Sequence, residues 1–560
     1  MLNRFFYFLP NNVEDLVAKE AEDWRLQNKV QLLWERDARL WTGRNESEWL
    51  GWLRIAEREV ADLEKYHEFA QFSRNFEFIV LLGMGGSSLC AEVLARTFKK
   101  DNFFVLDSTV PAQIVSVEKR IAPEKTLFIV ASKSGTTLEV DCLREYFYEK
   151  VSALLGEDKA GKHFVAITDP NTKLHVLARE RGFSRIFLGE PQIGGRFSAL
   201  SVFGLIPASA MQIDVERLLK EALFMSEICK LNQTEKNYGA ILGLILGVCW
   251  KLGKDKLTIF CSKEIESFGA WLEQLIAEST GKEGKAIIPI DKEKPLPKLS
   301  DYDDDRLFVH LKFKDSNAID SEGFAAFGNP FVRIEVKDEF SLSQEFFRWE
   351  FATAVASAIM QVNPFDQPDV ESTKVETRRL MKEYESSGEL AQKRPFFESD
   401  GVSLFADESY RANLEKFVGE EKSLAKFLEA HIEHIQEGDY FAILAYLKMD
   451  SQIEEALQQI RHKILHKKLC ATCIGFGPRF LHSTGQAYKG GPNSGVFLQI
   501  TANDEHQLPI PNRKYSFAVV KSAQAIGDFL VLSGKKRRIL HVHISGDVME
   551  GLERINGALI

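Results

Sequence analysis

The sequence lacks several features that would place it in common classes of protein. No apolar run approaches the roughly 20 residues that span a membrane. The N-terminus, Met-Leu-Asn-Arg-Phe-Phe-Tyr-Phe-Leu-Pro, has no signal-like apolar core followed by a small-residue cleavage site. The net charge of −10 gives no basic excess, which argues against a general nucleic-acid binder. We therefore expect a cytoplasmic protein that has neither nucleic-acid nor membrane partners.

The cysteines are few, and their spacing does not indicate disulfide pairs. There are seven, an odd number, and they are scattered rather than arrayed as a disulfide framework. Cys470-Ala-Thr-Cys473 has the spacing of a redox or metal pair, but no second pair exists and it lies in the apolar run 469–476. We expect buried thiols and no metal site.

The composition is that of a large globular protein. The chain has 560 residues, 45% of them hydrophobic and 27% charged, so several domains with sizeable cores can form. Strand-like apolar runs alternate with helical patterns, which predicts an α/β fold of doubly wound parallel sheets. The predicted strands are 78–82, 103–106, 126–131, 164–168, 185–188, 257–261, 286–290, 307–312, 331–336, 440–447, 469–476, 496–501, 517–520 and 539–544.

Helical patterns and polar stretches divide the chain into four parts. Residues 1–70 are predicted to be helix-rich, with Trp34, Trp41, Trp49 and Trp52 packing them onto the rest. Residues 71–214 and 215–385 read as two α/β domains, and 386–560 as a C-terminal α/β unit with helices at 451–467 and 522–532.

A hydroxyl-rich turn follows one predicted strand. Ser132-Lys133-Ser134-Gly135-Thr136-Thr137 comes directly after the run 126–131, and a helical pattern starts at Leu138. A phosphate in this turn would meet free N–H groups, hydroxyl donors and the positive end of the helix dipole. An isolated turn of this kind would more often be an ordinary N-cap.

A second loop strengthens the phosphate interpretation. Gly83-Met84-Gly85-Gly86-Ser87-Ser88 also joins a predicted strand to a helical pattern. A dinucleotide site is the alternative, because Asp107 stands about 20 residues further on, where that fingerprint has an acidic residue. The missing third glycine and the serines favour a monophosphate.

Three further segments have unusual polar content. In Gly194-Gly195-Arg196 the arginine could meet an anion or simply pair at the surface. Gln274 and Glu278 share one helix face, where Glu278 is either a general base or an ordinary helical carboxylate. The stretch 363–374 starts a new helix at Pro368 and ends on Lys374.

Together these segments resemble glucose-6-phosphate isomerases, whose cores are two sugar-isomerase (SIS) domains. The order Gly-x-Gly-Gly-Ser, Ser-Lys-Ser-Gly-Thr-Thr, Gly-Gly-Arg, Glu-Ser-x-Gly-Lys and Phe-Asp-Gln-x-x-Val-Glu-x-x-Lys is the family's, over roughly residues 30–380. The stretch 478–493 is similar to the isomerase part of bifunctional transaldolase/glucose-6-phosphate isomerase proteins, whose transaldolase part is expected to be absent here.

The resemblance implies an aldose–ketose isomerase of glycolysis and gluconeogenesis that forms a homodimer and needs no cofactor. Glu278 would move a proton between C1 and C2 of a hexose 6-phosphate through a cis-enediol, and Arg196 would stabilise the negative charge. Lys374 would help to open the sugar ring. The residues expected to hold substrate or phosphate are Gly86, Ser87, Ser132, Lys133, Ser134, Thr136, Thr137, Gln274 and Gln367.

The sequence departs from the family at the ring-opening histidine. The Asn-Gly-Gln-His motif expected between Glu278 and Gln367 is absent. His482 is the candidate instead, with Tyr488 at the position of a second histidine in the fusion-type relatives, although a structural histidine beside a Gly-rich turn fits equally well. A SIS-domain sugar-phosphate sensor, and an isomerase of mannose 6-phosphate or an amino-sugar phosphate, stay open as alternatives.

Overall fold

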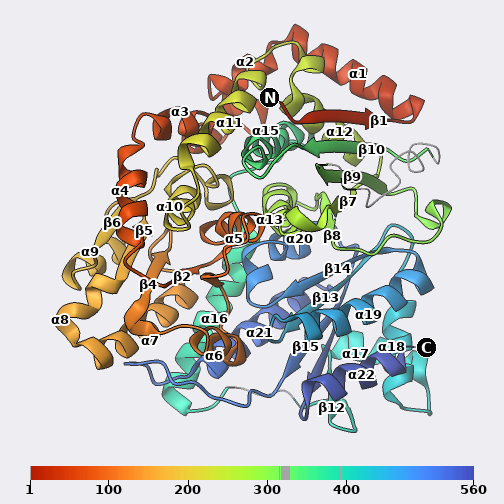
Figure 1. Ribbon diagram of the computed structural model, residues 1–560. Coiled ribbons are helices and arrows are strands. Elements are labelled where there is room, and N and C mark those ends of the chain that lie inside the picture. The colour runs from red at the N-terminus through yellow and green to blue at the C-terminus, as the bar shows by residue number, and fades with distance from the viewer. Residues whose placement is uncertain (1, 315, 317–327, 391–393, 560) are drawn as a thin grey trace. The chain divides into compact units, whose positions relative to one another are not determined.

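The computed structural model describes residues 2–314, 316, 328–390 and 394–559. The chain forms two compact units, and each is built from separate stretches of sequence (Figure 1). The first unit comprises Met1–Asp107, Val117–Lys292 and Asp305–Asp366, and the second comprises Ser108–Ser116, Glu293–Asp304 and Gln367–Ile560. The four-part division expected from sequence stays a prediction.

The first unit contains a five-stranded parallel sheet in the order β3-β2-β4-β5-β6. Each strand coincides with a predicted run, because strands buried on both faces read as continuous apolar stretches. The strands are β2 (Phe78–Gly83), β3 (Phe103–Leu106), β4 (Thr126–Ala131), β5 (Phe164–Thr168) and β6 (Arg185–Leu188). The connecting helices in this unit include α5 (Leu89–Thr97), α7 (Leu138–Leu155), α8 (Glu157–Ala160) and α9 (Lys173–Glu180), whereas α6 (Pro111–Glu118) lies mostly in the second unit.

A second sheet in this unit has the order β1-β10-β9-β7-β8. Its parallel strands β7 (Lys256–Cys261), β8 (Ile288–Asp291), β9 (Arg306–Phe313) and β10 (Phe331–Val336) were predicted. The edge strand β1 (Arg4–Phe8) was not: it pairs antiparallel with β10, from Arg4 opposite Glu335 to Phe8 opposite Phe331.

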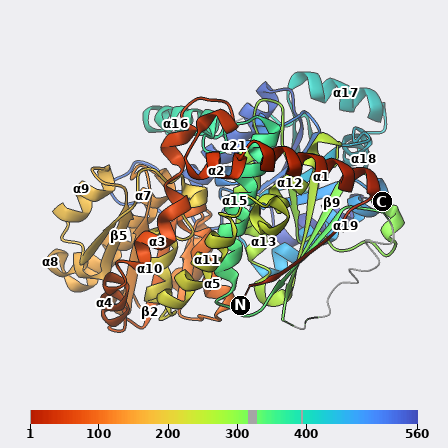
Figure 2. The ribbon, with the colours of Figure 1, turned by 90° about the horizontal axis from the view of Figure 1, so that it is seen from above.

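Long helices fill the space beside these sheets. The buried helix α15 (Leu342–Met360) packs along α12 (Tyr238–Lys251), and α1 (Asn11–Leu26) lies on α12 (Figure 2). The other helices of this unit are α2 (Lys29–Trp34), α3 (Ile55–Val60), α4 (Glu64–Ser73), α10 (Val202–Ala210), α11 (Val215–Ile228) and α13 (Phe268–Thr280).

Tryptophans join the N-terminal residues to this unit, as predicted. The Nε1 of Trp34 donates to the carbonyl of Cys229 at 2.9 Å, and that of Trp41 to the carbonyl of Ala354 at 2.8 Å. Trp52 is fully buried against Phe197, with ring centroids 5.2 Å apart. The indoles of Trp34 and Trp41 therefore satisfy carbonyls as well as filling the core, whereas Trp52 Nε1 has no hydrogen-bond partner among the described residues.

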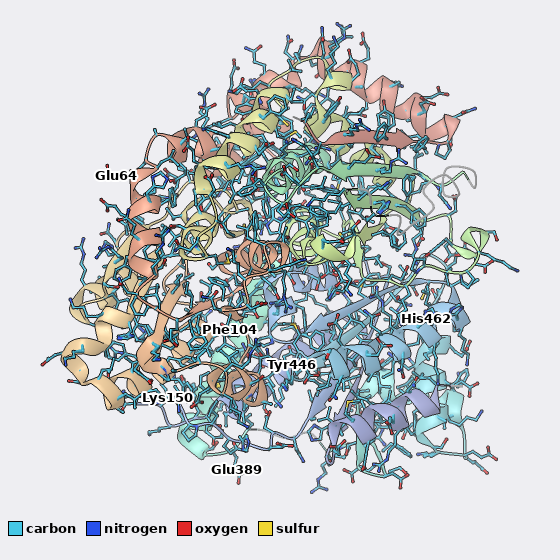
Figure 3. All side chains as sticks on the ribbon, viewed as in Figure 1. Glu64, Phe104, Lys150, Glu389, Tyr446 and His462 are labelled. Atoms are coloured by element: carbon cyan, nitrogen blue, oxygen red, sulfur yellow. The ribbon has the colours of Figure 1, made fainter. Side chains whose placement is uncertain are left out.

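The second unit contains a six-stranded sheet in the order β11-β12-β16-β15-β13-β14. Four parallel strands coincide with predicted ones, and Tyr446 ends the first of them (Figure 3). These are β13 (Tyr440–Tyr446), β14 (Ala471–Phe476), β15 (Gly495–Ala502) and β16 (Arg538–Ile544). The antiparallel strands β11 (Phe397–Ser399) and β12 (Val402–Phe405) form a hairpin that was not predicted.

The prediction of a strand at 517–520 was wrong. These residues start helix α21 (Phe517–Gly534), whose N-cap Ser516 accepts a hydrogen bond from the N–H of Val519. The other helices are α16 (Pro368–Ser387), α17 (Glu408–Val418), α18 (Leu424–Glu433), α19 (Ser451–Lys468), α20 (Gly485–Gly490) and α22 (Val548–Ala558). By length and composition α21 could cross a membrane, yet 67% of it is buried inside the protein, as in a core helix.

Candidate active site

The two predicted phosphate loops lie side by side. They follow β2 and β4, which pair in parallel, so both loops leave the same edge of the first sheet. The chain goes from β2 to β3 on one side, whereas β4 lies on the other. Ligands of open α/β sheets bind at the carboxyl ends of strands at such a switch of direction.

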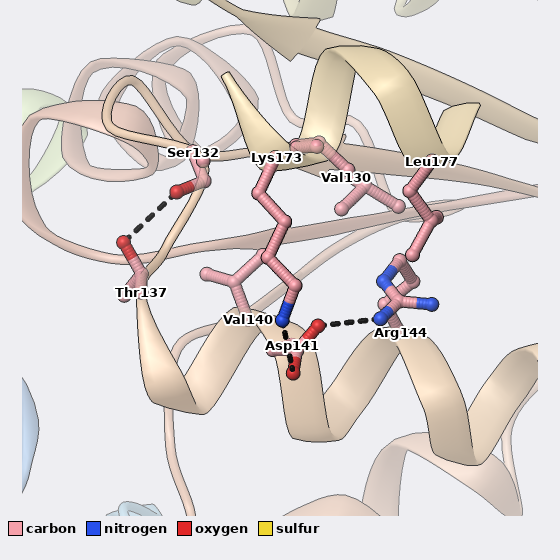
Figure 4. Close-up of a pocket in the computed structure, with 10 residues that line it drawn as sticks. Val130, Ser132, Thr137, Val140, Asp141, Arg144, Lys173 and Leu177 are labelled. Carbon is pink, nitrogen blue, oxygen red and sulfur yellow. Dashed lines mark hydrogen bonds and ion pairs between the residues drawn. The ribbon is translucent and has the colours of Figure 1, made fainter. Parts of the chain in front are cut away.

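The loop 132–137 forms the entrance to helix α7. The hydroxyls of Ser132 and Thr137 lie 2.9 Å apart, and no side chain caps the first N–H groups of α7 (Figure 4). Thr136 Oγ1 donates to Ser134 Oγ at 3.2 Å, and both residues are exposed. Behind the loop a cavity of about 10 Å³ could hold roughly one water molecule. The loop thus offers hydroxyls and N–H groups to an anion.

The side chain of Lys133, in this loop, is bound to two groups outside the loop. Its Nζ pairs with Asp169 and donates to the carbonyl of Glu190 at 3.0 Å. Burial lowers the pKa of Lys133 and raises the pKa of Asp169, and their mutual attraction opposes both shifts. The lysine therefore ties the loop to its surroundings, and phosphate binding by Lys133 stays a prediction.

The first loop is in backbone contact with the arginine loop. A Cβ on Gly86 would lie only 2.0 Å from the carbonyl oxygen of Gly195. Ser198 Oγ donates to both carbonyls, at 3.3 Å to Gly86 and 2.6 Å to Gly195. Glycine is therefore required at position 86, and this contact brings Arg196 beside the phosphate loops.

We expect Gly86→Ala to lower kcat/KM for a hexose 6-phosphate about 10²-fold, because the two loops must separate by roughly 1 Å. Gly194→Ala is the matched control, since a Cβ there meets no heavy atom within 4 Å and its φ is −69°. Steady-state kinetics of both variants test this, and equal activities would contradict the packing argument.

Arg196, Gln274 and Glu278 form one buried cluster. Arg196 Nη1 donates to Glu278 Oε2 at 3.1 Å, and Gln274 Nε2 donates to the same oxygen at 3.3 Å. Gln274 and Glu278 lie one turn apart near the end of α13, which contacts both the Gly85–Ser87 and the Gly195–Phe197 turns. A carboxylate held between two donors is oriented for proton transfer.

A lysine that was given no role in the sequence completes this cluster. The buried Nζ of Lys282 donates to the carbonyls of Asn363 and Asp366, both at 2.6 Å, and to Asp366 Oδ1 at 2.8 Å. Arg196 Nη2 donates to the carbonyls of Pro364 and Asp366, both at 2.8 Å. Arg196 and Lys282 thus both hold the turn 363–366, as a clamp. In the sequence, the only signal for Lys282 was its position four residues after Glu278.

Aromatic rings support this clamp. Phe197, next to Arg196, packs on Phe365 with ring centroids 5.1 Å apart, and Trp41 packs edge-on to Phe365 at 5.6 Å. The N-terminal residues therefore support both the arginine loop and the Phe-Asp turn. Asp107, the candidate ribose ligand of the dinucleotide alternative, accepts the hydroxyl of Ser88 at 3.3 Å inside the fold.

The remaining predicted residues belong to the second unit. Gln367 is the exposed N-cap of α16, and Lys374 Nζ pairs with Glu371 at 2.7 Å on that helix. His482 ends the short turn Arg479–His482, which contacts α16. Gln486 Oε1 accepts from the N–H groups of Asp369 and Val370, at 3.0 and 3.1 Å. The segment with His482 is thereby fastened to the start of the helix that carries Lys374.

Part of the chain is similar to known proteins. Residues 69–288, which include both phosphate loops, Arg196, Gln274 and Glu278, match the phosphoglucose isomerase family. A probable glucose-6-phosphate isomerase from Methanococcus maripaludis is 27% identical over 55% of this chain and 80% of its own. The glucose-6-phosphate isomerase of Mycoplasmopsis pulmonis is 27% identical over 60% of this chain and 90% of its own.

A solved structure shares the fold. A hypothetical protein from Thermus thermophilus superposes with a TM-score of 0.57 at 23% identity, over 67% of this chain and 99% of its own. The family resemblance and the α/β fold inferred from sequence are confirmed. Among the residues that the structure describes, no three His, Cys, Asp or Glu side chains form a group that could hold a metal ion.

Proposed function

We propose that this protein interconverts glucose 6-phosphate and fructose 6-phosphate through a cis-enediol, in glycolysis and gluconeogenesis. The observation that carries the proposal is the buried carboxylate of Glu278, held by Arg196 and Gln274 on a helix that contacts the Gly85–Ser87 loop. The match of residues 69–288 to the phosphoglucose isomerase family supports the same reaction.

Glu278 is the base in this proposal. Its carboxylate removes the proton from C2 of the open-chain aldose, and the electron pair forms the enediolate. A proton moves from the oxygen on C2 to the oxygen on C1, and protonated Glu278 delivers a proton, which can exchange with solvent, to C1 to give the ketose. Arg196 stabilises the negative oxygen of the intermediate, since a fixed guanidinium needs no reorganisation when charge develops. Gln274 orients the substrate.

The phosphate group is assigned to the two loops. Ser132, Ser134, Thr136 and Thr137 present hydroxyls at the N-terminus of α7, where N–H groups and the helix dipole favour an anion. Gly86 and Ser87 present the backbone of the neighbouring loop, with Lys133 adding positive charge and Gln367 a further contact.

The test is conversion of fructose 6-phosphate to glucose 6-phosphate, followed in a dehydrogenase-coupled assay. Turnover that disappears in Glu278→Gln supports the proposal. If the folded wild type binds hexose 6-phosphate without converting it, the protein is a SIS-domain sensor and the proposal fails. Conversion of mannose 6-phosphate alone would assign a different hexose.

Ring opening is assigned to Lys374 and His482. We expect His482→Gln and Lys374→Met each to lower kcat by at most about 10²-fold, less than a change of the base. Exchange NMR of the two anomers of glucose 6-phosphate measures ring opening directly and should slow in step with kcat. Lys382→Met, an exposed lysine on the same helix, is the control. Unchanged anomer exchange in both variants would remove these residues from the mechanism.

Alkaline pH should weaken the clamp on residues 363–366. Burial, followed by the charge of Arg196, lowers the pKa of Lys282 to about 8, although Asp366 and Glu278 oppose the shift. A neutral amine has two N–H donors for three acceptors. We therefore expect kcat/KM to fall above pH 8, and this fall to be missing in Lys282→Met, whose activity is low throughout.

Unfolding would not explain this loss. The pKa of Lys282 is below its unfolded value, so between pH 8 and about 10.5 the unfolded chain binds the additional proton. The contribution of Lys282 to the free energy of unfolding therefore rises with pH. Thermal unfolding at pH 7 and pH 9 separates the two effects, and wild-type activity that is flat up to pH 9.5 would contradict the prediction.

We further propose that the protein is a cytoplasmic homodimer, as the resemblance implies. Light scattering coupled to size-exclusion chromatography measures the mass directly. A monomeric mass with full isomerase activity would contradict the dimer and leave the reaction unaffected.

A further inference from the structure

The two faces of the third sheet differ in chemistry. On one face Leu404, Leu498, Ile500, Leu540 and Val542 belong to a hydrophobic core. Side chains alternate along strands, so the opposite face carries the residues between them. These are Phe405, Gln499, Thr501, His541 and His543. Four of these five side chains are polar and all five are buried or half-buried, so packing alone does not explain this face.

A cavity of about 460 Å³ lies on this polar face, within the second unit. The sheet contributes Phe405, Thr501, His541 and His543 to its lining, and residues of helices α16 and α21 also line it. The α21 residues Lys521, Ala525, Ile526 and Phe529 make much of the wall. This volume is in the range of small-molecule sites, which combine apolar walls with a few placed polar groups. The family match ends at residue 288, far from this cavity in sequence.

A chain of hydrogen bonds assigns the protons on the two histidines. Asn503 must direct its amide nitrogen at the carbonyl of Ser545, 2.9 Å away, because that carbonyl only accepts. Its Oδ1 therefore accepts from His543 Nε2 at 3.1 Å. His543 Nδ1 is then unprotonated and accepts the Thr501 hydroxyl at 2.8 Å. Thr501 in turn accepts from His541 Nε2 at 2.7 Å.

The chain of hydrogen bonds ends at His541, which offers an acceptor to the cavity. With its proton on Nε2, His541 is left with a lone pair on Nδ1, and this nitrogen has no hydrogen-bond partner among residues 2–314, 316, 328–390 and 394–559. It retains accessible surface, and the residue lines the cavity. Burial lowers the pKa of His541 to about 3 and also lowers the pKa of His543, so both rings are neutral at physiological pH.

A donor and two rings complete the lining. Lys521 Nζ pairs with Asp504 at 2.7 Å and donates to the carbonyl of Ala502 at 2.9 Å, which uses two of its three N–H groups. The ring of His541 is stacked on Phe405, with centroids 5.0 Å apart and planes 24° apart, and is tilted toward Phe529 at 5.8 Å. The cavity therefore has flat apolar walls, one acceptor and one ammonium N–H.

We propose that this cavity binds a planar heteroaromatic molecule that donates an N–H or O–H to His541 Nδ1 and accepts a hydrogen bond from Lys521. A flat ring suits a cavity lined by Phe405 and Phe529, since aromatic pairs gain more than their buried area alone. Because Lys521 is already neutralised by Asp504, the molecule is uncharged. This proposal does not depend on the proposed isomerase reaction.

Three probes of nearly equal size test the proposal on the full-length protein. 7-Azaindole has both an N–H donor and a ring-nitrogen acceptor, 1-methyl-7-azaindole lacks the donor, and indole lacks the acceptor. Isothermal titration should give 7-azaindole a dissociation constant of about 1 mM or tighter. The methylated probe should bind about tenfold more weakly, because it leaves a buried acceptor unpaired.

Two variants locate the binding. His541→Phe keeps the ring stack and removes the acceptor, so this variant should bind 7-azaindole only as weakly as the wild type binds 1-methyl-7-azaindole. His466→Gln, at an exposed histidine, is the control and should leave the affinity for 7-azaindole unchanged. Ile526→Trp fills the cavity from α21 and should abolish binding of every probe, with folding checked by circular dichroism. The proposal is wrong if no probe saturates the wild type, if the tenfold difference survives in His541→Phe, or if folded Ile526→Trp binds normally.

Discussion

The Glu278→Gln variant is expected to lose about 10²–10⁴-fold in kcat, the range of general acid–base catalysis, while hexose 6-phosphate still binds. The amide oxygen can still accept the hydrogen bond from Arg196 Nη1, so the cluster keeps its geometry. What is lost is the basic oxygen that takes the C2 proton. The coupled assay measures kcat, and fluorescence or calorimetric titration measures substrate binding.

The control for this variant is Glu264→Gln, which removes the same charge from an exposed position shortly before α13. Its activity should equal that of the wild type. Solvent deuterium incorporation at C2 of recovered glucose 6-phosphate provides a second reading, since it should vanish with the base. Glu278→Gln activity within threefold of the wild type would show that another group moves the proton.

The Arg196→Met variant is expected to lose about 10²–10³-fold in kcat, the usual loss for one donor to a developing oxyanion. A further loss should come from structure, because Arg196 Nη2 also holds the carbonyls of Pro364 and Asp366. Removing the guanidinium leaves Glu278 buried without its charged partner, and the side-chain exposures in this pair are only 3% and 9%.

Arg196→Lys separates these two effects. A single ammonium retains the charge but lacks the planar fork that reaches Glu278 and the turn 363–366 together. We expect it to recover part of the stability measured by thermal unfolding and little of kcat. Arg25→Met, at a 45% exposed side chain paired with Glu22, is the matched surface control. Full activity of Arg196→Met would exclude the arginine from the reaction.

Parallel strands were predictable because they are buried on both faces. Runs such as Phe78–Gly83 and Thr126–Ala131 are apolar throughout, which identifies them without knowledge of their neighbours. The strand β1 gives no such signal, since its residues are half-buried or exposed and its partner is a distant strand. The run 517–520 was too short to be told from the start of a buried helix.

The site residues that could be predicted from sequence are those that stand in a recognisable local motif. The loops and Glu278 have recognisable neighbours in sequence, whereas the clamp by Lys282 depends on residues about 80 positions away. The hairpin of β11 and β12 did have a local signal: Asp400 and Gly401 both adopt positive φ, as the two turn residues of a tight hairpin do. That signal was overlooked.

The edge strand β1 has a consequence for synthesis on the ribosome. Phe8 must pair with Phe331, 323 positions later, so its backbone has no partner strand while most of the first unit emerges. At about 5–20 residues per second this wait is on the order of 15 to 65 s. During that time an aromatic segment, Arg-Phe-Phe-Tyr-Phe, is open to pairing with other nascent chains. A ribosome-associated chaperone that shields the first ten residues would therefore raise the yield of folded protein more than one acting after release.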